Sequence, residues 1–168
     1  RIPIMTANLL LLLTAAIWGF GFVAQVLGMN YLGPFAFIGA RFLLGALSLL
    51  PVIWYLQRRQ SPDRPSVGYL LFASCVLGTI LFVASSFQQV GLLYTTASNA
   101  GFITGMYMVF VPIFGLMLGM ATGLITWLGC LVAACGLYLL GVDEQYQMGY
   151  GDLLQLAGAS IWALHILA

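Results

Sequence analysis

Long, uninterrupted apolar runs separated by short polar turns set the pattern of this chain. Runs of about 20 residues can cross the roughly 30 Å of membrane hydrocarbon at about 1.5 Å per helical residue. The apolar positions are continuous instead of alternating with polar ones, which favours helices over a barrel. The pattern predicts an all-α polytopic membrane protein with helices at about 8–27, 34–56, 67–91, 97–119 and 123–142, and a sixth, truncated transmembrane helix at 153–168.

Composition agrees with this class. Hydrophobic residues make up 62% of the chain and charged residues 5%, and the 78 residues between Arg64 and Asp143 carry no formal charge. A stretch of that length must cross the bilayer about three times. The chain has no lysine and a net charge of +1, so it lacks the basic face that nucleic-acid binding requires. The expected partners are the lipid bilayer and a small-molecule substrate.

Loop charges predict the topology. Arg58, Arg59 and Arg64 lie with Asp63 in the loop at 57–66. Short loops rich in arginine stay in the cytoplasm, so we expect this loop and the N-terminus to be cytoplasmic. The loop at 143–152 is then external.

The fourth run carries small residues at helical spacing. Small residues repeated every three or four positions let a second helix approach closely in lipid. Pro112 also removes a hydrogen bond to the carbonyl of Met108, so we expect a bend near the middle of this span. The same features are common in any multi-span bundle. The residues expected to pack against other helices are Gly101, Gly105, Pro112, Gly115 and Gly119.

Polar side chains form stripes on three of the predicted helices. Glutamine is costly in lipid, so a hydrogen-bonded or wet interior is favoured over a lipid-facing position. An uncharged, partly aromatic lining suits a small zwitterionic or apolar metabolite better than a multivalent anion. The hypothesis places seven residues along a substrate pathway: Trp18, Gln25, Ser85, Gln88, Asn99, Thr104 and Tyr107.

Arg41 is the one formal charge expected inside the hydrocarbon. Gly45 and Ser48 share its helical face, which favours an inward position and adds Arg41 to the predicted pathway. There it could contact one carboxylate or brace the second helix. The alternative is that its side chain reaches to the nearer membrane surface.

The sequence gives little support for a catalytic site or a metal site. Cys75, Cys130 and Cys135 lie inside spans, and a spacing of five on a helix does not bring two thiols onto one metal. His165 stands without a converging acid or nucleophile, so we expect no catalytic residue, no metal, no cofactor and no enzymatic activity. No carboxylate falls within a predicted span of the first repeat.

The end of the chain repeats its beginning. Residues 153–168 match residues 9–24 at an offset of 144, with seven of sixteen positions identical, including the pair Ile17-Trp18. The second copy begins after five spans, an odd number, so it enters the membrane from the opposite side to the first. Such inverted repeats are typical of secondary transporters. We therefore divide the chain into a first repeat at 1–142, an external loop at 143–152 and the first helix of an inverted second repeat.

Four segments together resemble the EamA-type members of the drug/metabolite transporter superfamily. They are TAAIWGFGFVA, ARFLLGALSLLP, GLLYTTASNAGFITGMYMVFVPIFGLMLG and TWLGCLVAACGLYLL, in this order. The resemblance covers nearly the whole chain. It implies ten helices in two inverted five-helix halves, cytoplasmic termini, and export of amino acids or other small metabolites by alternating access. On this reading the second half of the same protein is a missing partner.

Two other functions remain open from the residues. A small four-helix multidrug exporter acting as a homodimer is one, although that type resembles a chain with a glutamate in its first span, where this chain has Trp18 and Gln25. A non-transporting membrane sensor or scaffold is the other. A flux assay would separate both from a metabolite carrier.

Overall fold

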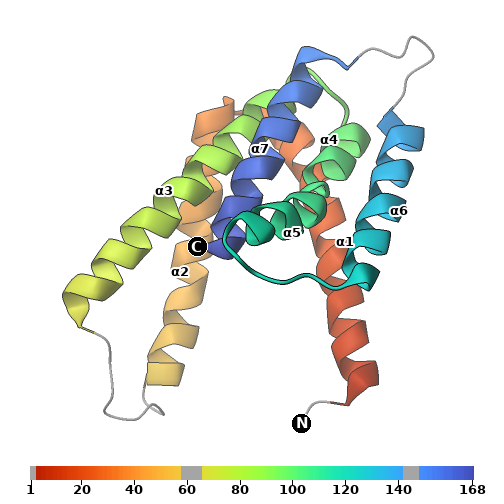
Figure 1. Cartoon of the computed structure of the whole chain (residues 1–168). Helices are drawn as coiled ribbons and strands as arrows, with labels where there is room; N and C mark the ends of the chain where they lie inside the picture. Colours follow the sequence, from red (N-terminus) through yellow and green to blue (C-terminus); the bar gives the residue numbers. More distant parts are fainter. Residues whose placement is uncertain (1–2, 58–65, 142–147) are drawn as a thin grey trace.

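The computed structural model describes residues 3–57, 66–141 and 148–168, and within these ranges the regular structure is entirely helical. The topology prediction rests on the loops at 57–66 and 143–152, of which residues 58–65 and 143–147 lie outside the described residues. The helices are α1 (Ile4–Met29), α2 (Pro34–Gln57), α3 (Val67–Gly91), α4 (Ala97–Thr104), α5 (Tyr107–Met117), α6 (Leu124–Gly141) and α7 (Tyr150–Leu167) (Figure 1).

Four segments are long and apolar enough to cross a membrane. They are α1, α2, α3 and the stretch Ala97–Met117 that holds α4 and α5, and α6 adds a shorter apolar segment at Leu124–Gly136. The chain is therefore an all-α polytopic membrane protein, as its sequence predicts. α7 falls outside this group because Asp152, Gln155 and His165 make it more polar.

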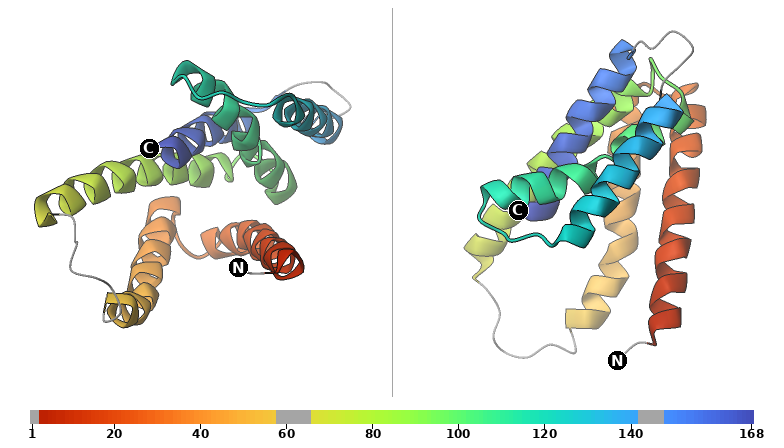
Figure 2. Two further views of the ribbon diagram at one scale, coloured as in Figure 1. Left: turned by 60° about the horizontal axis from the view of Figure 1, so that its bottom comes forward. Right: turned by 45° about the vertical axis from the view of Figure 1, so that its right-hand side comes forward.

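The helix α7 packs along one face against the rest of the protein, while Leu153 and Ile166 of the same helix are exposed. It lies against α3, α4 and α5, and it runs in the opposite direction to α1 (Figure 1). In a second view α1 and α2 lie on one side of the molecule and the other helices on the other side (Figure 2). The buried residues of α7 are Gly151, Asp152, Gln155, Gly158, Ala159 and Ala163.

Glycines bring α3 and α7 into close contact. A Cβ on Gly151 would lie 2.7 Å from the carbonyl carbon of Tyr94 and 2.8 Å from the main-chain oxygen of Gly91. A Cβ on Gly158 would lie 3.3 Å from the main-chain oxygen of Ala84. Backbone atoms cannot move away as a flexible side chain can, so the approach of the two helices depends on the absence of side chains at these positions.

The expected single helix at 97–119 is two helices in the structure. The break falls at Gly105 and Met106, about two turns before Pro112, and α5 continues across the proline. Proline removes one hydrogen bond to the carbonyl four residues earlier. Here that carbonyl, of Met108, accepts a hydrogen bond from the Cys130 thiol of α6, with a sulfur–oxygen distance of 3.8 Å. The break also divides the stripe of small residues between α4 and α5.

Gly119 ends α5 instead of packing against another helix. Its φ of +80° lies in the left-handed region that favours glycine. The N–H of Gly119 donates to the carbonyl of Leu116 and the N–H of Met120 to that of Gly115, the two bonds of a Schellman motif. Gly115 leaves room for the Met120 side chain, which would lie 3.7 Å from a Cβ added at that glycine.

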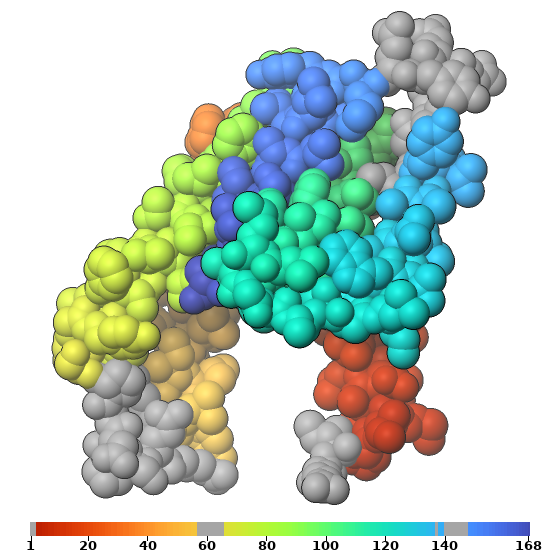
Figure 3. Space-filling view, viewed as in Figure 1, coloured from red at the N-terminus to blue at the C-terminus, as the bar shows by residue number. Residues whose placement is uncertain are grey.

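The N-terminal two-thirds of α1 and most of α2 make few contacts within the chain. Residues 8–20 of α1 are all exposed, and the lower ends of the two helices project separately with a hollow between them (Figure 3). These surfaces are apolar, as expected for helix faces that meet lipid or other transmembrane helices.

Candidate functional site

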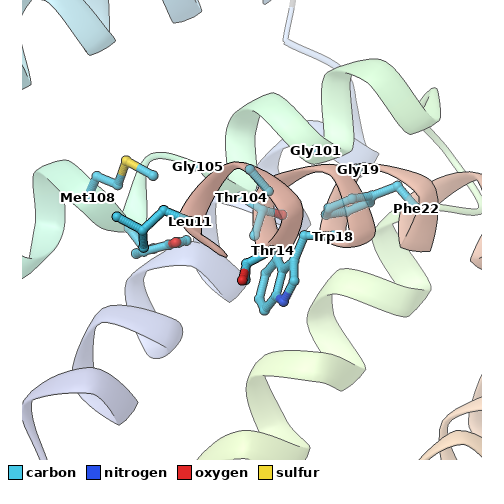
Figure 4. Close-up of a pocket in the computed structure, with 11 residues that line it drawn as sticks. Leu11, Thr14, Trp18, Gly19, Phe22, Gly101, Thr104, Gly105 and Met108 are labelled. Carbon is cyan, nitrogen blue, oxygen red and sulfur yellow. The ribbon is translucent and has the colours of Figure 1, made fainter. Parts of the chain in front are cut away.

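Two cavities adjoin along α1, and Trp18 and Phe22 line both of them. The first, called here the Thr104 cavity, has a volume of about 590 Å³ and lies between α1 and the α4–α5 break. Its α1 wall includes Thr14, and its opposite wall includes Tyr107. Close up, Leu11 and Met108 lie at one end of this cavity and Phe22 at the other (Figure 4).

The second cavity, called here the Arg41 cavity, has a volume of about 440 Å³. Gln25 of α1, Arg41 of α2 and Gln88 of α3 contribute its polar groups. Phe37 and Trp18 add aromatic walls. Polar and aromatic side chains from three helices therefore surround one volume, which is the general form of a small-molecule site.

Six of the eight predicted pathway residues line these cavities. They are Trp18, Gln25, Arg41, Gln88, Thr104 and Tyr107. The other two do not line either cavity. Ser85 is buried with no hydrogen-bond partner for its hydroxyl, and Asn99 is half-buried in the first turn of α4, where its main-chain N–H donates to the Thr96 hydroxyl.

A closed ring of hydrogen bonds joins three helices between the cavities. Gln155 Nε2 of α7 donates to the main-chain oxygen of Gln88 at 2.8 Å. Gln88 Nε2 donates to Thr104 Oγ1 at 3.3 Å, and Thr104 Oγ1 donates to Gln155 Oε1 at 3.3 Å. All three residues are buried, and Gln155 is 0% exposed. A buried amide left unpaired costs about 1–3 kcal/mol, so the ring gives α7 a specific position against α3 and α4.

Hydroxyl and amide groups of α1 bond within their own helix. Thr14 Oγ1 donates to the Leu10 carbonyl at 2.8 Å, and Gln25 Nε2 donates to the Gly21 carbonyl at 3.1 Å. The Gln25 oxygen remains buried without a partner. Such an unsatisfied acceptor on a cavity wall is available to a ligand.

Arg41 forms no ion pair within the described part of the chain. Its guanidinium lies 5.6 Å from the ring centre of Phe42, the next residue, and its side chain lines the Arg41 cavity. An arginine on a membrane-spanning helix that lines a cavity is a candidate for a functional residue.

Two tryptophans that occupy matching positions in the sequence, at an offset of 144, meet in the structure. Trp18 of α1 and Trp162 of α7 pack edge to face, with ring centres 5.8 Å apart. Trp162 in turn contacts His165 edge to face, also at 5.8 Å. The contact places α7 beside Trp18, which lines both cavities.

Asp152 belongs to the first turn of α7 and not to the preceding loop. Its carboxylate accepts hydrogen bonds from the Thr95 hydroxyl at 2.6 Å and from the Gly149 N–H at 3.1 Å. An acidic side chain at this position accepts a hydrogen bond from a main-chain N–H that has no partner within the helix. Its negative charge is also stabilised by the positive N-terminal end of the helix dipole. Asp152 therefore fixes the start of α7, at a distance from the two cavities.

No group of three or more histidine, cysteine or acidic side chains that could hold a metal ion is found among the residues described. Reasoning from sequence missed Gln155, Phe22 and Phe37. A glutamine within the repeated apolar run was the available signal for Gln155, since its counterpart at an offset of 144 is Leu11.

Comparisons with known proteins identify the family of the chain. Residues 5–142 match the EamA-like transporter family. Two proteins of Archaeoglobus fulgidus, both named uncharacterized transporter, are similar: one is 32% identical over 95% of this chain and 47% of its own length, the other 29% identical over 94% and 55%. The chain thus spans about half the length of these relatives. No solved structure matches it. The chain belongs to the EamA-like transporter family.

Proposed function

We propose that this chain forms the first repeat, and the first helix of an inverted second repeat, of a secondary transporter for small metabolites such as amino acids. The observation that carries the proposal is the pair of adjoining cavities, whose polar and aromatic linings meet at Trp18. The contact of Trp18 with its repeat counterpart Trp162 supports a pathway at the boundary between repeats. We further propose that the transporter exports its solute by alternating access across a bacterial inner membrane. In this proposal the N-terminus lies in the cytoplasm.

The cavity walls favour a small solute with both apolar and polar parts. Trp18, Phe22 and Phe37 offer apolar contact, while Gln25 and Arg41 offer one acceptor and one cation. A multivalent anion would call for several cations. Among the residues that line the two cavities, Arg41 is the one with a formal charge.

Flux through proteoliposomes tests the proposal. A labelled panel of amino acids, amines and carboxylates is loaded into vesicles that hold a protein with both repeats. We expect at least one solute to leave faster than from empty vesicles, and Trp18→Ala to lower that rate about tenfold because it removes a wall shared by both cavities. Vesicles holding residues 1–168 alone should stay at background, since a single repeat has no partner to move against.

Leu13→Ala is the matched control. Leu13 lies on the same helix, is exposed, and lines neither cavity. Its replacement should leave flux within twofold of wild type. Equal losses in Trp18→Ala and Leu13→Ala, or no flux of any solute, would count against the proposed pathway.

A further inference from the structure

The hydrogen-bond ring between α3, α4 and α7 can have only one direction. Gln155 has one amide atom 2.8 Å from the main-chain oxygen of Gln88. A carbonyl oxygen only accepts, so the amide atom facing it must be the nitrogen. The Gln155 oxygen then faces the Thr104 hydroxyl. The main chain of α3 thereby fixes the orientation of a side chain from α7.

This orientation of Gln155 determines where the hydroxyl proton of Thr104 points. A hydroxyl has one proton and two lone pairs. The proton goes to Gln155 Oε1, so the Gln88 amide atom that faces Thr104 must be its nitrogen. Thr104 keeps one free lone pair and no proton for the cavity, and the amide oxygen of Gln88 is turned away from Thr104.

The Thr14 hydroxyl of α1 is also left as an acceptor in the Thr104 cavity, because its proton goes to the Leu10 carbonyl of its own helix. The donors that remain in the Thr104 cavity are Tyr107 and the indole of Trp18. The Arg41 cavity is mixed: the buried Gln25 oxygen is an unpartnered acceptor, whereas Arg41 and the second amide N–H of Gln25 and of Gln88 can donate.

We propose that Gln155 is a positioning residue that gives Thr104 its acceptor character, and that the Thr104 cavity selects solutes that carry N–H donors, such as a primary ammonium group. The proposal rests on the proposed transport function for its biological meaning. An ammonium group would find acceptors at Thr104 and Thr14. A solute with acceptors alone would meet unfavourable lone pairs there, except beside Tyr107 and Trp18.

Loss of Gln155 should reverse the polarity at Thr104. In Gln155→Leu the Thr104 proton loses its acceptor and can rotate toward the cavity. Thr104 would then donate instead of accept. Thr104→Val removes the hydroxyl altogether, so it should remove the preference for donors without any change in α7.

Thiol modification measures this polarity without a known substrate. Ala15 lines the Thr104 cavity, so Ala15→Cys provides a reporter. In the background protein Cys75 and Cys135 are replaced by alanine, and Cys130 by serine, which keeps a donor for the Met108 carbonyl. The probes are the methanethiosulfonates with an aminoethyl (cationic donor) or a sulfonatoethyl (anionic acceptor) group. The measured quantity is the ratio of their two modification rates. We expect Gln155→Leu and Thr104→Val each to lower this ratio about fivefold, the factor that one hydrogen bond of ordinary strength gives.

Matched variants separate positioning from general damage. Thr104→Ser keeps the hydroxyl and should keep the ratio. Ser160→Ala, which removes a hydroxyl of α7 that donates to the Ala157 carbonyl of its own helix, should also keep it. Adding Gln155→Leu to Thr104→Val should change nothing further, because Gln155 acts through the hydroxyl.

The ratio of modification rates decides the proposal even if one variant fails to fold. If Gln155→Leu cannot be purified, Thr104→Val alone decides, and a ratio within twofold of the starting protein overturns the proposal. The same result in both variants overturns it as well. Because modification requires no transport, a lowered ratio without solute flux would refute the proposed function alone, and flux with an unchanged ratio would refute this inference alone.

Discussion

Arg41 and Gln25 give the Arg41 cavity opposite chemical characters on facing helices. The guanidinium of Arg41 offers paired N–H donors that match a carboxylate in shape. The unpartnered oxygen of Gln25 offers an acceptor. A solute with a carboxylate at one end and a donor at the other would satisfy both. Neither group alone would bind both ends of such a solute.

Arg41→Lys tests the role of the guanidinium. Lysine keeps the charge but loses the paired geometry, so we expect the half-saturation constant for a carboxylate-bearing solute to rise about tenfold with little change in maximal rate. A solute without a carboxylate should be unaffected. The measurement is initial flux in proteoliposomes at equal protein content. Lower expression with unchanged half-saturation would instead identify Arg41 as a brace for α2.

At this scale the sequence predicted residue types well and their partners poorly. Polar residues in apolar helices are expected to face a protein interior, and this reasoning selected Gln88 and Thr104, which meet in the structure. It could not select Gln155 as their partner, because helical periodicity gives the face of a side chain and not the neighbouring helix. Ser85 was selected by the same rule and is buried away from both cavities.

Among the elements, α7 depends most on close backbone contact. Its Gly151 lies against the main chain of α3 and of the turn that follows, with no room for a Cβ. The three-residue hydrogen-bond ring holds α7 at Gln155, within the helix. The hydrogen bonds of Asp152 hold it at its first turn. Several independent contacts therefore specify the position of α7 against α3 and α4.

Gly151→Ala should destabilise the packing of α7 against α3. The added methyl group would lie within 2.8 Å of backbone oxygens on two sides, so α7 must shift, and we expect a loss of about 1–3 kcal/mol from overpacking. The melting temperature of the purified protein in detergent measures the change. Gly78→Ala on α3, where a Cβ meets nothing within 4 Å, is the control and should be neutral or slightly stabilising. Equal melting temperatures for both variants would refute the close contact.

The boundaries of α2 and α3 were predicted closely, whereas α1 begins four residues before its expected start at residue 8 and α7 three residues before its expected start at 153. The expected starts and ends of α2 and α3 agree with the structure to within one residue, because proline and the polar turns mark them. The 97–119 span was expected to bend at Pro112, yet it breaks at Gly105. The proline is tolerated inside α5 because a thiol from α6 occupies the carbonyl it frees, a tertiary contact that local sequence does not encode.

On the scale of the whole molecule, the two cavities lie at different depths along α1. Residues 11–22 line the Thr104 cavity and residues 17–25 the Arg41 cavity, so the second lies nearer the C-terminal end of the helix. Trp18 and Phe22 stand between them. With a cytoplasmic N-terminus, the proposed arrangement opens the Thr104 cavity toward the cytoplasm and the Arg41 cavity toward the outside.

Sided labelling of cysteines tests this central claim most directly. Ala15→Cys in the Thr104 cavity and Ala24→Cys in the Arg41 cavity are compared with Leu13→Cys and Phe20→Cys, exposed positions of α1 that line neither cavity. A membrane-impermeant maleimide is applied to intact cells and to inverted vesicles. We predict that Ala15→Cys reacts in inverted vesicles, that Ala24→Cys reacts in intact cells, and that the two control positions react in neither. Equal labelling of cavity and control positions, or none at either cavity position, would contradict the account.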